Sequence, residues 1–450
     1  MFVGYAKSGK HITFKLQPTE AETAKTSQIS LGAHVANVEL PYDIGDIHPD
    51  MLALCAFLIA GPFAKDELTF QLGISPTLAE AMSTAKPNCK IGPIDNGLPA
   101  RPRPENGKPG LCFSGGVDST AALELLPPET ELFFLKRTAP LHNLREHYWL
   151  TFKKLAAQLL LKRKTYLKSS DSGVRFCEIL RMNNREAFVI GSNLEYVRNP
   201  VGFPHDRACT VPLLLMADSR NLDAVAWGTI AEAAYQFGNF GAYKDLSQRK
   251  LFKHYNALFS AVGLPILNPV VGLSEVATSR IVSSSVYLPY TQSCQRESIK
   301  PCKRCIKCFR KSLLDATVSG EWPDDKELDR YFSEPDIRKT LEALPIKLEN
   351  VYAFITSRYE GRHPAMLALK KRVRGDAVAV DWMTKYIPSS IDLAPPKYHS
   401  ALKDSLSRFI DPMSAADVQV MENWNVNNAP NDPRTIKLLD DLKAAMKKSS

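Results

Sequence analysis

The pattern of hydrophobic and polar positions divides the chain into regions of different character. In the first region, apolar and polar side chains alternate over residues 11–16 and 34–40, which is typical of strands with one buried face. The almost wholly apolar stretch 48–63 indicates a buried helix with a proline near its start. Prolines and glycines then crowd into residues 87–110, where they favour turns. The pattern therefore predicts a small α/β N-terminal domain over 1–86 and a linker over 87–110.

From residue 111 onward, short apolar runs alternate with amphipathic ones. Runs of strand length lie at 110–116, 131–137, 186–192 and 223–229, and helical patterns lie at 118–126, 144–163 and 210–220. Such alternation is typical of a parallel sheet covered by helices on both faces. We therefore expect an α/β fold with a doubly wound parallel sheet over 111–320, followed by a helical C-terminal domain over 321–450.

The composition is that of an ordinary soluble globular protein. Of the 450 residues, 44% are hydrophobic and 23% are charged. The chain begins without an apolar segment of signal-peptide length, and the apolar run at 51–64 is too short to span a bilayer. The formal net charge of +9 suits anionic ligands such as ATP, but spread over this length it does not favour nucleic acid. We expect a cytoplasmic protein with no membrane partner.

The stretch CFSGGVDST at 112–120 carries distinctive chemistry. Its two glycines follow a predicted strand and precede a predicted helix, so backbone amides and the helix dipole can approach a phosphate closely. An aspartate in this place would repel a bare phosphate but can hold Mg²⁺ beside pyrophosphate. The loop lacks the lysine of the Walker pattern, and the alternative is a glycine turn that only joins strand to helix. We expect ATP to be bound by Ser114, Gly115, Gly116, Val117, Asp118 and Ser119, with Ser114, Asp118 and Ser119 as the catalytic set.

Four of the nine cysteines crowd together near the end of the α/β region. They are Cys294, Cys302, Cys305 and Cys308, in a C-x7-C-x2-C-x2-C spacing. Four thiolates in a tight knuckle suit tetrahedral zinc and leave no open position, so we expect a structural metal site. Lysines and arginines between 300 and 311 can offset the negative charge of such a centre. An iron–sulfur cluster is the other metal option, and an RNA-binding patch is the other interpretation of the basic residues.

Together these motifs resemble a known family. SGGVDS matches the SGGxDS signature of the PP-loop ATP pyrophosphatases, and its combination with the cysteine spacing resembles QueC, the 7-cyano-7-deazaguanine synthase. The resemblance covers residues 111 to about 320 and includes ILNPVVGLSEVATSRIV at 266–282. It implies that ATP is cleaved to AMP and pyrophosphate and that the carboxylate of 7-carboxy-7-deazaguanine is adenylated. In QueC, ammonia then displaces AMP, and a second ATP leads to a nitrile.

The added N- and C-terminal regions point to a particular branch of that family. This long form resembles the QueC-like proteins of bacterial antiphage systems, namely QatC and the type IV CBASS member. The resemblance implies that the acyl group passes to the N-terminal amine of a partner protein, which the extra regions would dock. We therefore expect a ligase whose partners are ATP, a 7-deazaguanine carboxylate and a protein, with ATP, Mg²⁺ and structural Zn²⁺ as cofactors.

Further pocket candidates lie at or after the predicted strands, because strand ends in open α/β sheets face the ligand crevice. We expect Lys136 and Gly228 to bind the nucleotide. Arg207 can bind a substrate carboxylate in bidentate fashion, and Glu232 can bind Mg²⁺ or a base edge. Lys244 lies in a loop, residues 238–250, that can close over phosphates. Each charged candidate also has a plain structural alternative, and GFPHDR at 202–207 departs from the V-P-x-R-N segment of QueC.

Three other functions remain open from the sequence. The first is the housekeeping QueC reaction with ammonia, which makes 7-cyano-7-deazaguanine for queuosine biosynthesis. The second is a tRNA-modifying PP-loop enzyme, although Cys112 and Cys209 form no extra C-x2-C pair. The third is a zinc-stabilised, non-enzymatic nucleotide-binding scaffold.

Overall fold

The computed structural model describes residues 1–23, 29–138, 170–238, 242–294, 300–425 and 432–448. The helix predicted over 144–163 lies outside these residues, as do positions 239–241 of the loop predicted to close over phosphates. The described residues form two compact units. The first unit comprises 1–114, 127–226 and 250–267, and the second comprises 115–126, 227–249 and 268–450.

A ten-stranded sheet forms the framework of the first unit, in the order β12-β11-β7-β8-β9-β4-β2-β1-β5-β6. In its first half, every strand is parallel to its neighbours in that half. These strands are β7 (Lys108–Phe113), β8 (Glu131–Arg137), β9 (Ala187–Ser192), β11 (Leu222–Ala226) and β12 (Ile266–Leu267). Most side chains of β7, β8 and β11 are buried, as expected where both faces of a strand are covered. The order runs outward from β7 in both directions, so the first of these strands along the chain is the central one.

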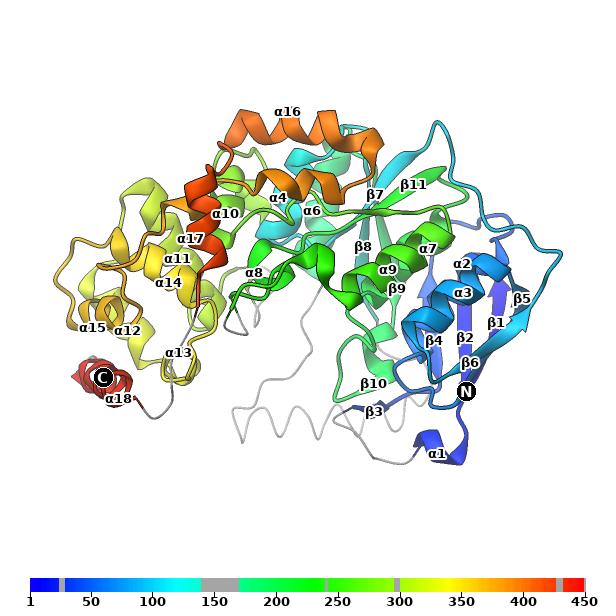
Figure 1. Ribbon diagram of the computed structural model, residues 1–450, viewed down its shortest axis with the longest axis horizontal. Helices are drawn as coiled ribbons and strands as arrows, with labels where there is room; N and C mark the ends of the chain where they lie inside the picture. The colour runs from blue at the N-terminus through cyan, green and yellow to red at the C-terminus, as the bar shows by residue number, and fades with distance from the viewer. Residues whose placement is uncertain (24–28, 139–169, 239–241, 295–299, 426–431, 449–450) are drawn as a thin grey trace. The chain divides into compact units, whose positions relative to one another are not determined.

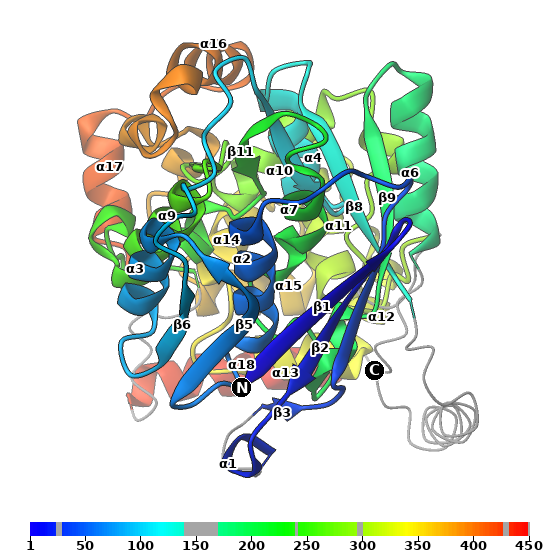
Figure 2. The same ribbon diagram turned by 90° about the vertical axis from the view of Figure 1, so that its right-hand side faces the viewer.

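The other half of the sheet comes from the N-terminal region. Its strands are β4 (Val35–Glu39), β2 (His11–Gln17), β1 (Phe2–Ser8), β5 (Glu67–Ile74) and β6 (Lys90–Ile94). β1, β2 and β4 are antiparallel, and Figure 2 shows β1 and β2 as long neighbouring strands. Ile12, Phe14 and Leu16 are buried while the residues between them are more exposed, which confirms the alternation read from the sequence.

The two halves meet where β4 pairs antiparallel with β9, through Val38 opposite Ser192 and Glu39 opposite Gly191. The compact units therefore differ from the predicted domains. Strands from residues 1–86 share one sheet with strands from the 111–320 segment, and β6 lies inside the predicted linker. This pairing joins strands that are far apart along the chain, and neither composition nor periodicity carries information about it.

The first unit also contains helices, most of which contact strands of this sheet. They are α1 (Glu20–Thr23), α2 (Pro49–Ala60), α3 (Pro76–Ala85), α6 (Asp171–Met182), α7 (Val211–Met216) and α9 (Lys250–Ala261), with 3-10 turns η1 (Leu194–Val197) and η2 (Ala208–Thr210) and a short ladder of β3 (Ser30–Leu31) with β10 (Arg198–Asn199). The helix α2 is buried from Asp50 to Ala60 and contacts β5 and α7, which confirms the buried helix predicted there. Among the described residues, no helix has both the length and the apolar character needed to cross a membrane.

The second unit is almost entirely helical (Figure 1). Its elements are α4 (Val117–Leu125), α8 (Ala231–Ala234), η3 (Leu246–Gln248), α10 (Glu275–Ser283), η4 (Leu288–Tyr290), α11 (Ile306–Ser319), α12 (Asp325–Ser333), α13 (Pro335–Leu341), α14 (Glu349–Ser357), α15 (Pro364–Arg372), η5 (Asp381–Thr384), η6 (Pro388–Leu393), η7 (Pro396–Tyr398), α16 (His399–Phe409), α17 (Ala415–Glu422) and α18 (Pro433–Lys448). An aromatic cluster fills its core, where Phe309 of α11 packs on Tyr331, Phe332 and Tyr352. The helical character predicted for 321–450 is confirmed over its described residues.

Candidate functional site

The glycine loop joins β7 to α4 through a sharply turned backbone. Gly115 has a φ of 73°, a left-handed conformation that glycine adopts without steric cost. Gly116 is the N-cap residue of α4 and has no side chain with which to cap the helix. The predicted order of strand, loop and helix is confirmed. Since the N-cap residue supplies no side-chain acceptor, the start of α4 has the form that favours an anion.

Hydroxyl groups of the loop motif have different environments. Ser119 Oγ and Thr120 Oγ1 each donate to the carbonyl oxygen of Gly116, at 3.0 Å in both cases. Both of these side chains are buried, whereas Ser114 is exposed. Ser119 therefore stabilises the turn in this conformation, and Ser114 is the serine of the motif that lies at the surface.

Gly228 approaches the first turn of α4 closely. A Cβ atom at this position would lie 2.8 Å from the carbonyl oxygen of Asp118 and 3.0 Å from the backbone nitrogen of Ser119. These partners are backbone atoms, which cannot move aside as a flexible side chain can. The second unit thus brings Gly228 together with residues 115–119, all of which we expected to bind nucleotide.

The carboxyl group of Asp118 faces the neighbouring helix α10. Thr278 Oγ1 donates to Asp118 Oδ1 at 3.1 Å, and α4 and α10 pack against each other. Burial raises the pKa of Asp118, and the cation of Lys311 opposes that rise. A half-buried carboxylate that is costly to ionise by itself is suited to bind a divalent cation.

A short segment ahead of the cysteines binds the glycine loop. The N–H of Gln292 donates to the carbonyl oxygen of Gly115 at 2.8 Å. The N–H of Val117 donates to Ser293 Oγ at 3.2 Å. The next residue along the chain is Cys294, so the loop and the cysteine cluster are joined by consecutive residues.

The four predicted metal ligands form one buried cluster. The sulfur atoms of Cys294, Cys302, Cys305 and Cys308 all lie within 4.8 Å of one another, and those of Cys302 and Cys308 are 3.9 Å apart. Cys305 is the N-cap residue of α11, and Cys308 lies in its first turn. Zinc–sulfur bonds of about 2.3 Å in a tetrahedron place sulfur atoms about 3.8 Å apart. The cluster can therefore hold a metal ion such as zinc.

Two thiols of this cluster, those of Cys302 and Cys308, resist ionisation without a cation. Burial raises the pKa of Cys302 to about 11, and the hydrogen bond to Cys305 raises the pKa of Cys308 further. The thiolate is the form that binds a metal, and a bound cation stabilises it. The donor set, the burial and the sulfur spacing therefore agree with a metal centre.

Two of the basic residues near the cysteines belong to a buried ion pair network. Arg310 Nε lies 3.0 Å from both carboxylate oxygens of Glu275, and Lys311 Nζ lies 3.5 Å from Oε1. Burial alone would raise the pKa of Glu275, but Arg310 and Lys311 overcome that effect and hold it at about 2. The sequence suggests that these cations offset the charge of the metal cluster, whereas the structure places them on Glu275 of α10.

Glu232 lies in the same network as a buried helix cap. Its carboxyl oxygens accept the backbone N–H of Glu275 at 3.0 and 3.1 Å, and Oε1 accepts Asn350 Nδ2 at 3.0 Å. Burial raises the pKa of Glu232 to about 7. In this conformation Glu232 holds the start of α10, and its proposed contact with Mg²⁺ or a base stays a prediction.

Lys136, Arg207 and Lys244 are the remaining candidates. Lys136 is exposed at the end of β8, and Arg207 is half-buried just before η2, both in the first unit. Lys244 is exposed in the second unit, where its backbone N–H donates to the carbonyl oxygen of Tyr235 at 2.8 Å. Their roles toward nucleotide and substrate stay predictions.

The residues that the sequence does not mark as functional are those that contact the loop from distant parts of the chain. Thr278 and Ser293 contact α4 and the loop, yet no spacing or composition marks either one. Glu275 and Thr278 did lie inside the segment 266–282 that carried the resemblance, which was the available signal.

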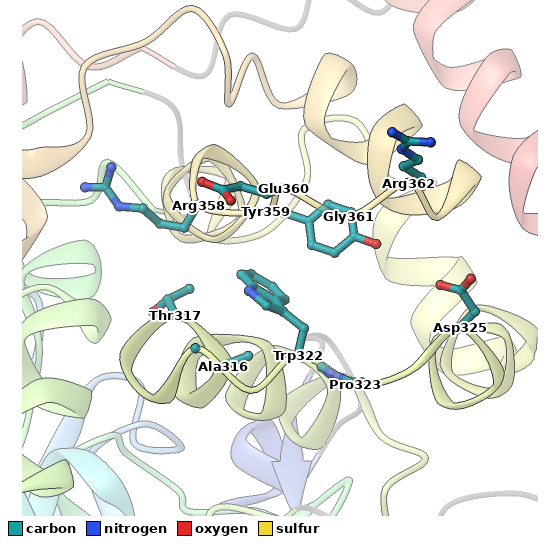
Figure 3. A pocket seen from close by; sticks show the side chains of 11 residues that line it. Ala316, Thr317, Trp322, Pro323, Asp325, Arg358, Tyr359, Glu360, Gly361 and Arg362 are labelled. Atoms are coloured by element: carbon teal, nitrogen blue, oxygen red, sulfur yellow. The ribbon is translucent and has the colours of Figure 1, made fainter.

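A pocket of about 550 Å³ lies elsewhere in the second unit, between the end of α11 and the turn after α14 (Figure 3). The rings of Trp322 and Tyr359 meet edge to face there, with centroids 5.0 Å apart. Figure 3 shows Arg358 and Arg362 on either side of these rings. Aromatic and arginine side chains of this kind are enriched where proteins bind one another.

Fold and site together define a mixed α/β protein with a large, mostly parallel sheet and a cysteine cluster that can bind a metal. Over residues 254–425 the chain is similar to a protein family described as "Family of unknown function (DUF6395)". No curated protein and no solved structure matches the chain. The matched range contains the cysteine cluster, α10 and Ser293, and it begins after the glycine loop.

Proposed function

We propose that this protein is an ATP-dependent enzyme of the QueC type, which adenylates the carboxylate of a 7-deazaguanine and transfers the acyl group to an amine. The observation that carries the proposal is the SGGVDS loop placed directly after the central strand β7. Read from β9 to β12, the parallel half of the sheet has the order 3-2-1-4-5. That order is the doubly wound arrangement in which nucleotides bind beyond the first strand, and it supports a PP-loop fold.

The loop has the groups that ATP binding needs. Backbone amides and the dipole at the start of α4 favour a triphosphate, and glycines at 115 and 116 let it approach. Asp118 would hold Mg²⁺, with Thr278 fixing the orientation of the carboxylate. Bound Mg²⁺ supplies positive charge to the phosphate oxygens. Backbone amides of the loop stabilise the charge that develops at the α-phosphorus.

In the proposed reaction, a carboxylate oxygen of the deazaguanine attacks the α-phosphorus of ATP, pyrophosphate leaves, and an acyl adenylate forms. An amine then attacks the acyl carbon, loses a proton and expels AMP, which gives an amide. We favour the N-terminal amine of a partner protein as the acceptor, within bacterial antiphage defence. With ammonia the product is the primary amide, which a second ATP would convert to 7-cyano-7-deazaguanine.

The cysteine cluster has a structural role in this proposal. Four thiolates would occupy all four positions of tetrahedral Zn²⁺ and leave none for substrate or water. The helical region beyond residue 320 would dock the partner protein, and the pocket beside Trp322 is a candidate contact because its aromatic and arginine side chains suit a protein surface.

Incubation of the metal-loaded protein with ATP, Mg²⁺ and 7-carboxy-7-deazaguanine tests the proposal. With a neighbouring protein or ammonia as acceptor, mass spectrometry should detect AMP and pyrophosphate together with a mass increase on the protein or a nitrile product. Asp118→Asn keeps the shape of the side chain and should abolish AMP release while metal stays bound at the cysteines. Release of ADP and phosphate in place of AMP and pyrophosphate, or full activity of Asp118→Asn, would overturn the assignment.

A further inference from the structure

We propose that Ser293 is a positioning residue that couples the metal-binding cysteine cluster to the glycine loop, so that metal occupancy sets how tightly the loop holds a triphosphate. The inference rests on the proposed function for its effect on ATP. The coupling itself rests on contacts within the second unit.

The consecutive residues Thr291, Gln292 and Ser293 form hydrogen bonds with the start of α4 and the loop before it. The N–H of Gln292 donates to the carbonyl oxygen of Gly115 at 2.8 Å, and Ser293 Oγ accepts the N–H of Val117 at 3.2 Å. One residue earlier, the hydroxyls of Thr291 and Thr120 are 3.2 Å apart. Together these contacts reach the loop at Gly115, the first residue of the helix and the first turn at Thr120.

Ser293 supplies a hydrogen-bond acceptor to the start of α4 from a distant part of the chain. The first backbone N–H groups of a helix have no intrahelical acceptor, and a serine, threonine or aspartate at the N-cap position normally accepts from the second or third of them. Here the N-cap residue is Gly116, which has no side chain, and the acceptor for Val117 comes from a serine 176 positions along the chain. The start of α4 thus combines a glycine N-cap, which lets an anion approach closely, with an acceptor that comes from outside the loop.

The cysteine cluster restrains the position of Ser293. Cys294 follows Ser293 directly, is only 2% exposed, and its sulfur accepts the backbone N–H of Cys302 at 3.4 Å. A metal bound by the four sulfurs would tie Cys294 to Cys305 and Cys308 at the start of α11, and would thereby fix the position of Ser293.

A second connection runs from α11 to the loop through α10. Arg310 of α11 is bound to Glu275 at the start of α10, and Thr278 one turn further along donates to Asp118. The helix α11, which carries Cys308, is therefore connected to α4 both through the cysteine cluster with Ser293 and through α10. The contact of α10 with α4 would hold α4 in position when the hydrogen bond from Val117 to Ser293 is removed. Loss of the Ser293 hydroxyl alone should therefore loosen the start of the helix without unfolding the unit.

Hydrogen–deuterium exchange of the full-length, metal-loaded protein tests the coupling directly. Ser293→Ala should speed exchange in the peptide that covers Val117 about fivefold, the size expected for loss of an N-cap hydrogen bond, with the metal content unchanged. Ser293→Thr keeps the hydroxyl and should restore protection. Ser283→Ala is the matched control, because that serine is exposed and its hydroxyl donates within its own helix to Arg280. Equal exchange in Ser293→Ala and Ser283→Ala would overturn the proposal.

Chelation of the metal separates coupling from simple capping. In the wild-type protein, chelation should weaken the affinity for ATP, measured by calorimetry with Mg²⁺, by about five- to tenfold, and should speed exchange at Val117. In Ser293→Ala the affinity should already be weaker, and chelation should lower it less. An equal loss in both proteins, or none in the wild type, would contradict coupling through Ser293. If chelation unfolds the second unit, the exchange rates of metal-loaded Ser293→Ala and Ser283→Ala are the measurement that tests the coupling.

Failure of the proposed function would look different. A wild-type protein that binds no ATP, or forms no AMP, would remove the proposed reaction while the exchange measurement still judges the contact between Ser293 and Val117. A wild-type protein that is active, with Ser293→Ala unchanged in exchange and affinity, would remove the coupling alone.

Discussion

Replacement of Arg310 by methionine is expected to destabilise the second unit strongly. The guanidinium lies 3.0 Å from both oxygens of Glu275, and the two side chains are only 8% and 5% exposed. Methionine fills a similar volume but leaves the carboxylate buried, with Lys311 at 3.5 Å as its remaining close cation. Removal of one partner from a buried pair costs about 3–5 kcal/mol, because the other charge is left uncompensated.

The pKa of Glu275 gives the same order of magnitude. Arg310 and Lys311 overcome the effect of burial and hold it at about 2, against an ordinary value of 4.5. At about 1.4 kcal/mol per pH unit, that difference corresponds to roughly 3 kcal/mol. Since the folded-state pKa lies below the unfolded one, the stabilisation is fully present above pH 4.5. It is lost as the pH falls from there toward about 2.

Thermal unfolding of the metal-loaded protein at pH 7 measures the effect. A loss of 3–5 kcal/mol should lower Tm by about 6–20 °C in a unit of this size. Arg330→Met is the matched control, because Arg330 pairs with Glu327 at the surface and such pairs contribute less than about 1 kcal/mol. The double variant Arg310→Met with Glu275→Gln should recover part of the loss. A shift for Arg310→Met no larger than that for Arg330→Met would refute the reasoning.

Three further predictions concern the site itself. Gly228→Ala places a carbon 2.8 Å from the carbonyl oxygen of Asp118, and calorimetry should show ATP affinity reduced about tenfold, while Gly45→Ala, with open space around it, should match the wild type. Burial raises the pKa of Glu232 to about 7, above its ordinary value of 4.5, so ionisation of this carboxyl should destabilise the wild-type protein as the pH rises from about 4.5 to 7. Glu232→Gln removes the ionisable group. Urea unfolding should therefore show Glu232→Gln gaining stability relative to wild type between pH 5 and pH 8, and a difference independent of pH would contradict this. Cys305→Ser should lower the bound metal measured by mass spectrometry and reduce the unfolding free energy by several kcal/mol, and full metal content would count against the cluster as the metal site.

Sequence patterns predicted those parts of the fold and site that depend on neighbouring residues. The alternation at 11–16 fixes which face of β2 is buried, and the apolar run at 48–63 forms the buried helix α2. Cys302, Cys305 and Cys308 are only three positions apart, so it could be predicted that they lie together in a turn and the helix start that follows it. In each case the structural consequence follows from residues a few positions apart.

Contacts between distant segments could not be predicted in this way. The pairing of β4 with β9 extends the sheet across the expected domain boundary, and one sequence contains no signal for which edges will meet. The partner of Arg310 is a comparable case, because a lysine- and arginine-rich stretch beside four cysteines suggests charge compensation of the metal. Burial of Glu275 on the adjacent helix explains this choice of partner, since a buried carboxylate that lacks a nearby cation is strongly destabilising.

The start of α10 shows how the buried charges in this unit are balanced. Glu232 and Glu275 meet there, because the carboxyl group of Glu232 accepts the backbone N–H of Glu275. Two neighbouring buried carboxylates are not both ionised easily, and the cations of Arg310 and Lys311 lie on Glu275. Glu275 therefore carries the charge, while burial raises the pKa of Glu232 to about 7 and favours its neutral form. Ionisation of Glu232 above that pH would add a second negative charge at the start of α10, beside the carboxylate of Glu275, and would therefore be unfavourable.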